Sequence, residues 1–309
     1  MSRARRRTSD QTPNFSTTER HHGGTIMTLH EQLMSTITTF ALDAGAIARR
    51  AQAEATASLK EDESYVTEVD LTLSKLAFER LSQVLPEHAI VSEEHLQNLS
   101  RYGAAPVAPD ADGHEVFAVI DPIDGTRNYY HGVPLYGVSL GVFRDRKPWI
   151  GVVAFPALGE FFAFDGEGVA FTKDAWSDSP HTTVLAEPRD NSAIDRNQIV
   201  LFTNSYTRRY RWSYDVCTWL VTGCAAANAC WPLAGRGAAT VLTDHVWDFA
   251  GAWPMLEFLG FELRGSVSGE RMDVYDASWF DGDSLMLREP VVASRPAHFE
   301  ALRDGIIDL

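Results

Sequence analysis

The hexapeptide Asp121-Pro122-Ile123-Asp124-Gly125-Thr126 follows directly on a short apolar run, residues 116–120. Such a run predicts a buried strand that delivers both aspartates to its end. The proline stiffens the chain between the two acids, and the glycine permits a tight turn. Both carboxylates and the carbonyl of Ile123 can then converge on one point, as hard cations such as Mg²⁺ require. A helix beginning at Gly125 and Thr126 would present backbone N–H groups to an anion.

The same hexapeptide also has a purely structural interpretation, because Asp-Gly turns are common. Further acids shift the balance toward a metal site. Glu93 and Glu94 follow a second buried-looking strand. Asp70 ends the segment 65–70, and Asp248 stands at the head of an apolar helix. Taken singly, each of these acids fits a surface pair or a helix cap.

Around the hexapeptide, apolar periodicity predicts two helices and several strands. The first helix begins just after Met27, with one apolar face formed by Leu29, Leu33, Ile37, Phe40, Ala44, Ile47 and Ala51. A second helix is stopped by Pro86 and is marked by Leu73, Ala77, Leu81 and Val84. Strands are expected over 89–91, 116–120, 136–143, 149–155 and 160–164. Turns are expected at 144–147 and 165–166.

The second half of the chain predicts polar loops over 174–197, followed by alternating elements. Strands are expected over 199–203 and 291–293. Helices are expected near 211–220, 224–234 and 247–259, with a last one between 296 and 307. The order is helices first, then an antiparallel-rich sheet, then alternating elements, which predicts a mixed α/β fold in layers.

Length and charge narrow the class of protein. The 309 residues, 45% of them hydrophobic, suffice for one large domain or two fused ones. A net charge of −15 argues against nucleic-acid binding, which needs clustered basic residues. No apolar run approaches the roughly 18–20 residues that span a bilayer, so we expect no membrane association. Because the net charge is negative, a phosphate ligand would need a bound metal ion to make the electrostatic potential at its site positive.

The first 26 residues differ in composition from the rest. They carry five arginines against Asp10 and Glu19, many Ser and Thr, and few apolar residues. We therefore expect a disordered extension over 1–26 and a folded domain over 27–309, with subregions of about 27–185 and 186–309. A targeting peptide, a true start at Met27 and a DNA-binding arm are the alternatives.

The three cysteines lie in one alanine-rich segment, at Cys217, Cys224 and Cys230. They fit neither a disulfide framework nor a CxxC metal pair, which indicates a reducing compartment and a cytoplasmic protein. We expect them to be small buried hydrophobes.

Four separated motifs stand out in order: Val66-Thr67 with Asp70, Ser92-Glu93-Glu94, residues 121–134, and residues 247–252. From about Met27 to the C-terminus the chain resembles the Mg²⁺-dependent, lithium-sensitive inositol monophosphatase family, which includes histidinol-phosphate, fructose bisphosphate and 3′-phosphonucleotide phosphatases. The resemblance implies an αβαβα sandwich and a homodimer. It also implies two or three Mg²⁺ ions, with Mn²⁺ as a substitute and Li⁺ as an inhibitor.

The resemblance further implies a role for each matching residue. The first metal would be held by Glu93, Asp121 and the Ile123 carbonyl, and the second by Asp121, Asp124 and Asp248. A third, weaker ion would rest partly on Glu93. The implied catalytic residues, which orient and deprotonate a metal-bound water, are Asp70, Glu93 and Thr126. The implied substrate contacts are Gly125, Thr126, Gly223, Ala225 and Asp248. Lys60 lies near the position of a lysine that the family often carries.

Substrate choice is where the sequence departs from the family pattern. The inositol phosphatases carry an acid seven residues before the aspartate of the Trp-Asp motif, and here that residue is Val241, with Asp244 nearby. Arg127, Arg236, Asp244 and His245 are candidates for shaping a different pocket. The expected function is Mg²⁺-dependent hydrolysis of a small sugar- or polyol-type phosphate, similar to inositol monophosphate. Histidinol phosphate, fructose 1,6-bisphosphate and 3′-phosphonucleotides remain alternatives, as does a catalytically silent phosphate-binding protein.

Overall fold

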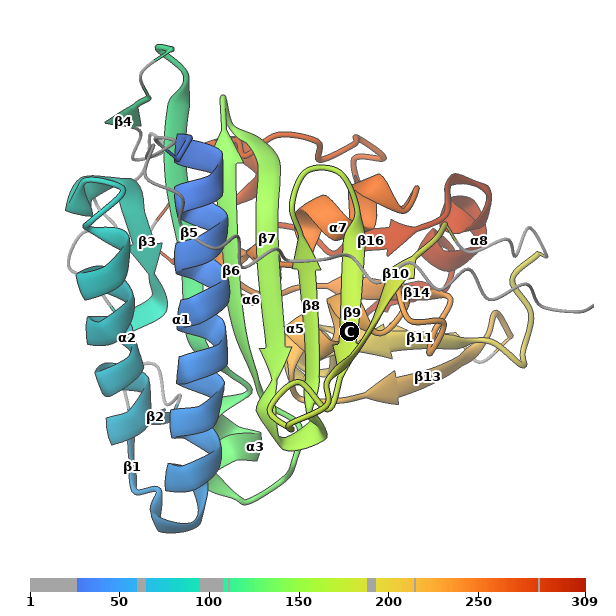
Figure 1. The fold of residues 1–309 in the computed structure, drawn as a ribbon. Helices are drawn as coiled ribbons and strands as arrows, with labels where there is room; N and C mark the ends of the chain where they lie inside the picture. The colour runs from blue at the N-terminus through green and yellow to red at the C-terminus, as the bar shows by residue number, and fades with distance from the viewer. Residues whose placement is uncertain are drawn as a thin grey trace, which may run out of the picture.

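The computed structural model describes residues 27–59, 65–94, 108–110, 112–187, 193–213, 215–282 and 284–309. Over these residues helices and sheets stack in five layers, in the order helix, sheet, helix, sheet, helix (Figure 1). This arrangement confirms the expected αβαβα sandwich. The extension 1–26 and Lys60 lie outside the described residues, so the predictions made for them stay predictions.

Two long helices, α1 (Leu29–Ala51) and α2 (Glu68–Leu81), form the first layer. Thr28 caps α1 in a reciprocal pair with Glu31. The buried face of α1 includes Leu33, Ile37, Phe40 and Ala44, as the periodicity predicted. A two-stranded pair, β1 (Ala57–Leu59) and β2 (Tyr65–Thr67), joins the two helices.

The large sheet runs in the order β10-β9-β8-β7-β6-β5-β3, and β4 also pairs with β5. Its strands are β3 (Ile90–Ser92), β4 (Ala108–Pro109), β5 (Glu115–Asp124), β6 (Gly137–Arg144), β7 (Lys147–Phe155), β8 (Glu160–Phe164), β9 (Val169–Lys173) and β10 (His181–Leu185). The β3–β5 pair is parallel, and the other pairs are antiparallel. The short helix α3 (Thr126–Tyr130) begins immediately after β5.

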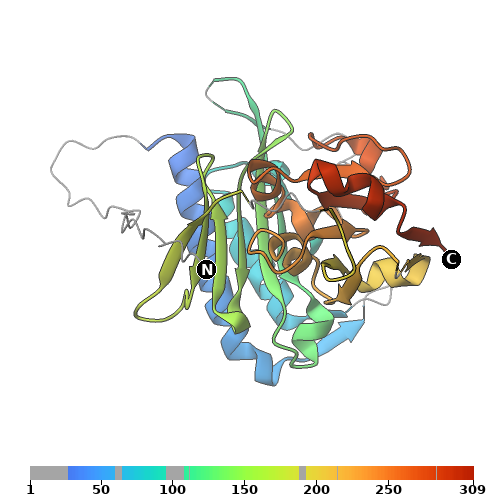
Figure 2. The same ribbon diagram turned by 90° about the vertical axis from the view of Figure 1, so that its right-hand side faces the viewer.

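The second sheet has the order β13-β11-β14-β16-β15, with β11 parallel to both β13 and β14. Its strands are β11 (Ile199–Phe202), β13 (Thr218–Val221), β14 (Ala239–Leu242), β15 (Glu262–Gly265) and β16 (Val291–Ser294). Between the two sheets lie α5 (Ala225–Cys230), α6 (Val246–Ala250) and α7 (Trp253–Phe258), which share the largest buried apolar cluster with both sheets. Figure 2 shows this half of the molecule from the side of the second sheet.

The outer face of the second sheet is covered by α4 (Asn204–Arg209) and α8 (Phe299–Arg303). The last strand of the chain, β17 (Ile306–Asp308), forms an antiparallel pair with β12 (Tyr210–Trp212). None of the helices over the described residues combines the length and the apolarity that a bilayer crossing requires.

Three element predictions in the second half are wrong. The helix expected near 211–220 is replaced by β12 and β13, because Trp212 turns inward and donates its indole N–H to the Cys217 carbonyl at 3.0 Å. The polar loops over 174–197 contain β10, a mostly exposed edge strand without apolar alternation. The last helix ends at Arg303, where the chain leaves it to pair with β12.

The predicted helix over 247–259 is divided into α6 and α7 by close packing at Gly251. This glycine fits against the carbonyl of Val152 and the backbone N of Leu140, so the chain here lies directly on the sheet. The helix predicted over 224–234 likewise ends early, at Cys230.

Gly141 of β6 sets the distance between the large sheet and α6. A Cβ at Gly141 would overlap the carbonyl oxygen of Ala250 and lie 2.6 Å from its carbonyl carbon. Ser139 on the same strand donates to the Trp247 carbonyl at 3.0 Å. Together these contacts hold α6, and the acid it carries, against the end of β5.

Replacing Gly141 by Ala should lower the free energy of unfolding by about 1–3 kcal/mol, because backbone atoms of Ala250 cannot move aside cheaply. Urea unfolding followed by tryptophan fluorescence measures the change. Gly282→Ala is the control, since a Cβ there meets nothing within 4 Å. Equal unfolding midpoints for the two variants would contradict this account of the packing.

Candidate metal and phosphate site

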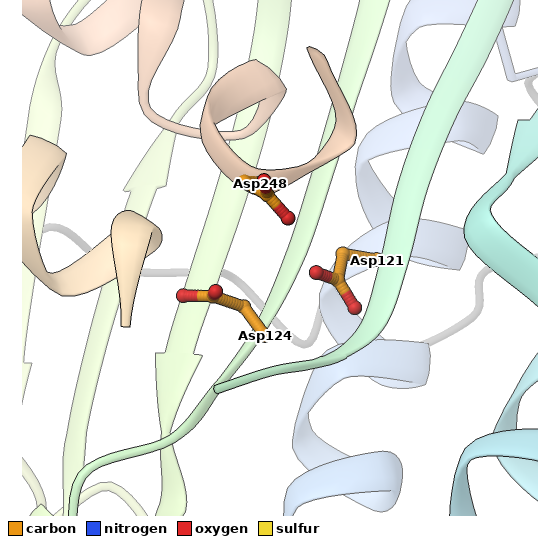
Figure 3. Close-up of side chains that lie close together, drawn as sticks. All are labelled: Asp121, Asp124 and Asp248. Carbon is orange, nitrogen blue, oxygen red and sulfur yellow. The ribbon is translucent and has the colours of Figure 1, made fainter. Parts of the chain in front are cut away.

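Three carboxylates from two distant segments converge at the end of β5. Asp121, Asp124 and Asp248 each offer an oxygen, and these oxygens lie within 4.8 Å of one another. Figure 3 shows the three side chains lying close together, two from β5 and one from α6. Asp121 and Asp124 are buried, and Asp248 is half-buried. The convergence predicted from the hexapeptide is therefore present in the fold.

A bulge in β5 places Asp121 and Asp124 on the same face of the strand. In a regular strand, residues three apart point to opposite faces. Here the pairing with β6 shifts register between Asp121 and Asp124, so that the intervening residues form a bulge. The backbone N of Ile123 donates to Asp121 at 2.9 Å and stabilises the bulge.

Asp248 is fixed by the first turn of α6. Its carboxylate accepts a hydrogen bond from the backbone N of His245 at 2.8 Å. The interpretation of this acid as part of a helix cap is therefore confirmed, and its role as a metal ligand stays a prediction. Since one oxygen caps the helix, the other is left to face the β5 acids.

Asp70 and Thr126 meet beside the acid cluster. The Thr126 hydroxyl lies 3.3 Å from an Asp70 oxygen and 3.0 Å from the Ile123 carbonyl. Asp70 is buried, and its other oxygen accepts the backbone N of Thr67 at 2.9 Å at the start of α2. Gly125 introduces α3 with φ +81, a conformation that L side chains rarely adopt.

Glu93 directly follows β3, the parallel neighbour of β5, and is half-buried. It lies outside the group of three acids whose oxygens come within 4.8 Å of one another. It nevertheless lines the same cavity as Asp124 and Asp248. Its charge is close enough to raise the pKa of Asp121.

Burial raises the pKa of Asp121 far above its ordinary range, and repulsion by Glu93 and Asp248 raises it further. Burial, followed by repulsion from Asp248, likewise raises the pKa of Asp124. In the described part of the chain no Lys or Arg forms an ion pair with either acid. Buried carboxylates that lack a cation fit a site for divalent metal ions.

The N-terminal turn of α5 orients Asp124. Its two oxygens accept hydrogen bonds from the backbone N of Ala225 at 3.1 Å and of Ala226 at 2.7 Å. The Cys224 thiol donates to the same carboxylate at 2.8 Å. The cysteine is buried, as predicted, but its role as a donor was not foreseen, because its partner lies 100 residues away in the chain.

Asp124 and Asp248 line a cavity of about 570 Å³. Its lining includes all five residues predicted to contact substrate, Gly125, Thr126, Gly223, Ala225 and Asp248. Arg127, Asp244 and His245 also line it, whereas Arg236 pairs instead with Glu160. Residues not predicted for this site are Thr203, Asn204, Ser205, Arg208, Ser284 and Met286.

One signal for the missed residues was present in the sequence. Thr203 ends the predicted strand 199–203, and Asp244 follows β14, which runs parallel to β11. Because parallel strands present their carboxyl ends at one edge of a sheet, residues after both strands meet there.

The sequence model of the inositol monophosphatase family matches residues 29–304. The chain belongs to the inositol monophosphatase family. Members of this family are phosphoric monoester hydrolases, and so is this protein. This membership also confirms the resemblance carried by the four motifs.

The names of curated relatives in this family give different activities. A histidinol-phosphatase of Chlorobaculum parvum is 28% identical over 68% of this chain and 76% of its own length. An inositol monophosphatase of Mesembryanthemum crystallinum is 27% identical over 75% of this chain and 79% of its own length. The similarity therefore leaves the substrate open.

Solved structures share the fold. The Thermotoga maritima IMPase superposes with a TM-score of 0.64 at 19% identity and covers 89% of this chain and 96% of its own. Staphylococcal inositol monophosphatase-1, solved as a LiCl-soaked inhibitory complex, gives 0.64 at 19% identity, with coverages of 92% and 99%.

We expect the metal-free protein to lose stability as pH rises. Asp121 and Asp124 hold protons more tightly in the folded chain than in the unfolded one, so unfolding releases protons and is favoured by higher pH. Their contribution is complete below about pH 4, the ordinary Asp range, and is lost as pH rises through the raised folded values. Thermal denaturation in EDTA between about pH 5 and 8 measures this trend.

Mg²⁺ should abolish that trend and raise the melting temperature. At 100-fold excess over its dissociation constant the ion should add about 2.7 kcal/mol to the free energy of unfolding. A melting temperature indifferent both to Mg²⁺ and to chelator would argue strongly against the site.

Cys224→Ala should weaken metal binding about 10-fold or more, because Asp124 loses one of its three donors. Cys224→Ser keeps a donor and should bind nearly as the parent does. Cys217→Ala is the matched control, since this thiol is buried elsewhere. Titration calorimetry with Mn²⁺ compares the variants. Equal dissociation constants for Cys224→Ala and Cys217→Ala would contradict a role of the Cys224 thiol in metal binding.

Proposed function

We propose that the protein is a Mg²⁺-dependent phosphomonoesterase that acts on the phosphate ester of a small polar alcohol. The observation that carries the proposal is the convergence of Asp121, Asp124 and Asp248, of which the last two line the cavity, without a Lys or Arg partner in the described residues. A sugar- or polyol-type phosphate similar to inositol monophosphate is the substrate class suggested by the sequence, and histidinol phosphate is the second candidate.

Two metal positions fit the residues present. Asp121, Asp124 and Asp248 would hold one ion, and Asp121 with Glu93 and the Ile123 carbonyl would hold another. Bound divalent ions would neutralise the phosphate and lower the pKa of an attacking water. A third ion resting partly on Glu93 and the use of Mn²⁺ in place of Mg²⁺ belong to the same proposal.

Asp70 and Thr126 would orient the attacking water and take up the proton that it releases. Asp70 is held by the start of α2 and touches the Thr126 hydroxyl, so the pair can orient a water and accept its proton. Gly125 and Thr126 would bind the phosphate through their backbone N–H groups. Gly223 and Ala225, which also line the cavity, would contact the alcohol.

Three further properties extend the proposal. A homodimer and a cytoplasmic location follow from the family resemblance and the free cysteines. Inhibition by Li⁺ is supported by the staphylococcal relative with its LiCl-soaked inhibitory complex.

Asp124→Asn should lower the rate of phosphate release by at least about 100-fold, because a metal ligand is lost. The substrate panel is inositol 1-phosphate, L-histidinol phosphate, fructose 1,6-bisphosphate and a 3′-phosphonucleotide, each assayed with Mg²⁺. The variant should stay folded in EDTA, since the substitution removes one repelling charge. Asp215→Asn, at an exposed ion pair, is the control. Undiminished turnover in Asp124→Asn would overturn the assignment.

A further inference from the structure

A second cavity, of about 450 Å³, lies at the ends of strands β11 and β14 that are opposite to the converging acids. Ile199, which begins β11, and Ala238, which directly precedes β14, both line it. Because the two strands are parallel, their amino ends meet at this cavity, and their carboxyl ends lead to Thr203 and Asp244. Among the described residues the two cavities have no lining residue in common. A ligand bound here would therefore lie apart from the acids proposed to hold metal.

The ionisable side chains that line this second cavity are all basic. They are Arg236, Arg295 and the buried His298, and no Asp or Glu in the described part of the chain joins them. The whole chain carries a net charge of −15, so a wall without acids is a local departure from its composition. Guanidinium groups donate hydrogen bonds and accept none, which suits them to ligands with anionic oxygens.

An acid outside the second cavity holds Arg236 in place. The buried Glu160 of β8 accepts a hydrogen bond from Arg236 Nη1 at 2.7 Å and another from Nη2. A guanidinium has five N–H donors in a planar fork, so this pair does not use all of them. Arg236 is therefore fixed in position and still able to donate to a ligand in the cavity.

Arg295 is fixed by contacts that leave its acid partner easy to replace. Its Nη1 donates to the Leu259 carbonyl at 2.8 Å, and its guanidinium lies 5.5 Å from the centre of the Phe261 ring. Nη1 also lies 2.8 Å from Glu187, but the Glu187 side chain is 67% exposed and that of Arg295 only 11%. An ion pair with such an exposed acid contributes little to stability. A ligand anion could therefore take the place of Glu187 with little loss of stability.

We propose that the second cavity binds a small organic anion through carboxylate or phosphate groups, which accept hydrogen bonds from Arg236 and replace Glu187 at Arg295. Both kinds of group present paired oxygens that match the planar fork of a guanidinium. The volume of about 450 Å³ lies in the range of roughly 300–1,000 Å³ that is typical of small-molecule sites. Phosphatase activity is not needed for this binding, so a failure of the proposed function would not affect it.

Isothermal titration calorimetry of the full-length protein in EDTA tests this binding with two anions, succinate and glycerol 3-phosphate. Chelation removes the divalent ions that would attract an anion to the converging acids. At least one of the two anions should bind with a dissociation constant of about 1 mM or lower. The tighter of the two identifies carboxylate or phosphate as the group recognised. Succinamide has the shape of succinate without its charge and should not bind measurably.

Substitutions at Asn197 change the charge of the wall while both arginines are kept. Asn197 lines the cavity and is exposed, so its variants should keep the melting temperature of the wild type. Asn197→Asp should weaken binding of the anion about threefold or more, Asn197→Lys should strengthen it by a similar factor, and Asn197→Ala should stay within about twofold. Glu187→Gln should also strengthen binding, because it removes the acid with which the ligand competes for Arg295.

The proposal is overturned if neither anion reaches the expected affinity, or if succinamide binds as tightly as succinate. It is also overturned if Asn197→Asp and Asn197→Lys bind the anion equally, since the ligand would then lie at another site. An affinity of Glu187→Gln no higher than that of the wild type would show that the ligand does not replace Glu187 at Arg295, and would overturn the proposal as well.

Discussion

The mutual repulsion of buried carboxylates is the constraint around which this end of the molecule is organised. Asp121 and Asp124 lie in the interior beside Asp248, where low dielectric strengthens their repulsion. The fold opposes it with fixed contacts: a bulge in β5, the donors at the start of α5 and the first turn of α6. Buried like charges held together by fixed contacts fit a site for divalent cations.

The two sheets contribute different parts of the cavity. The large sheet carries two of the three converging acids on β5, and the contact between Asp70 of α2 and Thr126 of α3 lies beside them. The second sheet supplies Thr203 and Asp244 from the ends of parallel strands β11 and β14. The wall of the cavity is therefore built from separate elements of the two sheets.

The sequence predicted the elements whose pattern is strong and local. The apolar face of α1 and the strands around the hexapeptide lie where expected, because long periodic segments bury the residues that their period dictates. The failures have two causes. The 211–220 segment was expected to be helical, yet Trp212 packs inward and β13 pairs with β11, contacts that local periodicity does not encode. Edge strand β10 was missed because its exposed faces need no apolar residues.

What the sequence determined by itself is the chemistry: which acids exist, their order, and the turn after Asp124 that only a glycine accommodates easily. What the tertiary structure decided is proximity and burial. The thiol of Cys224 reaches Asp124 only because two sheets pack against a shared helical layer. Asp244 meets the hydroxyls of Thr203 and Ser205 because the parallel strands β11 and β14 end side by side. Distances between residues far apart in the chain depend on the packing of whole layers, and no local pattern records how those layers meet.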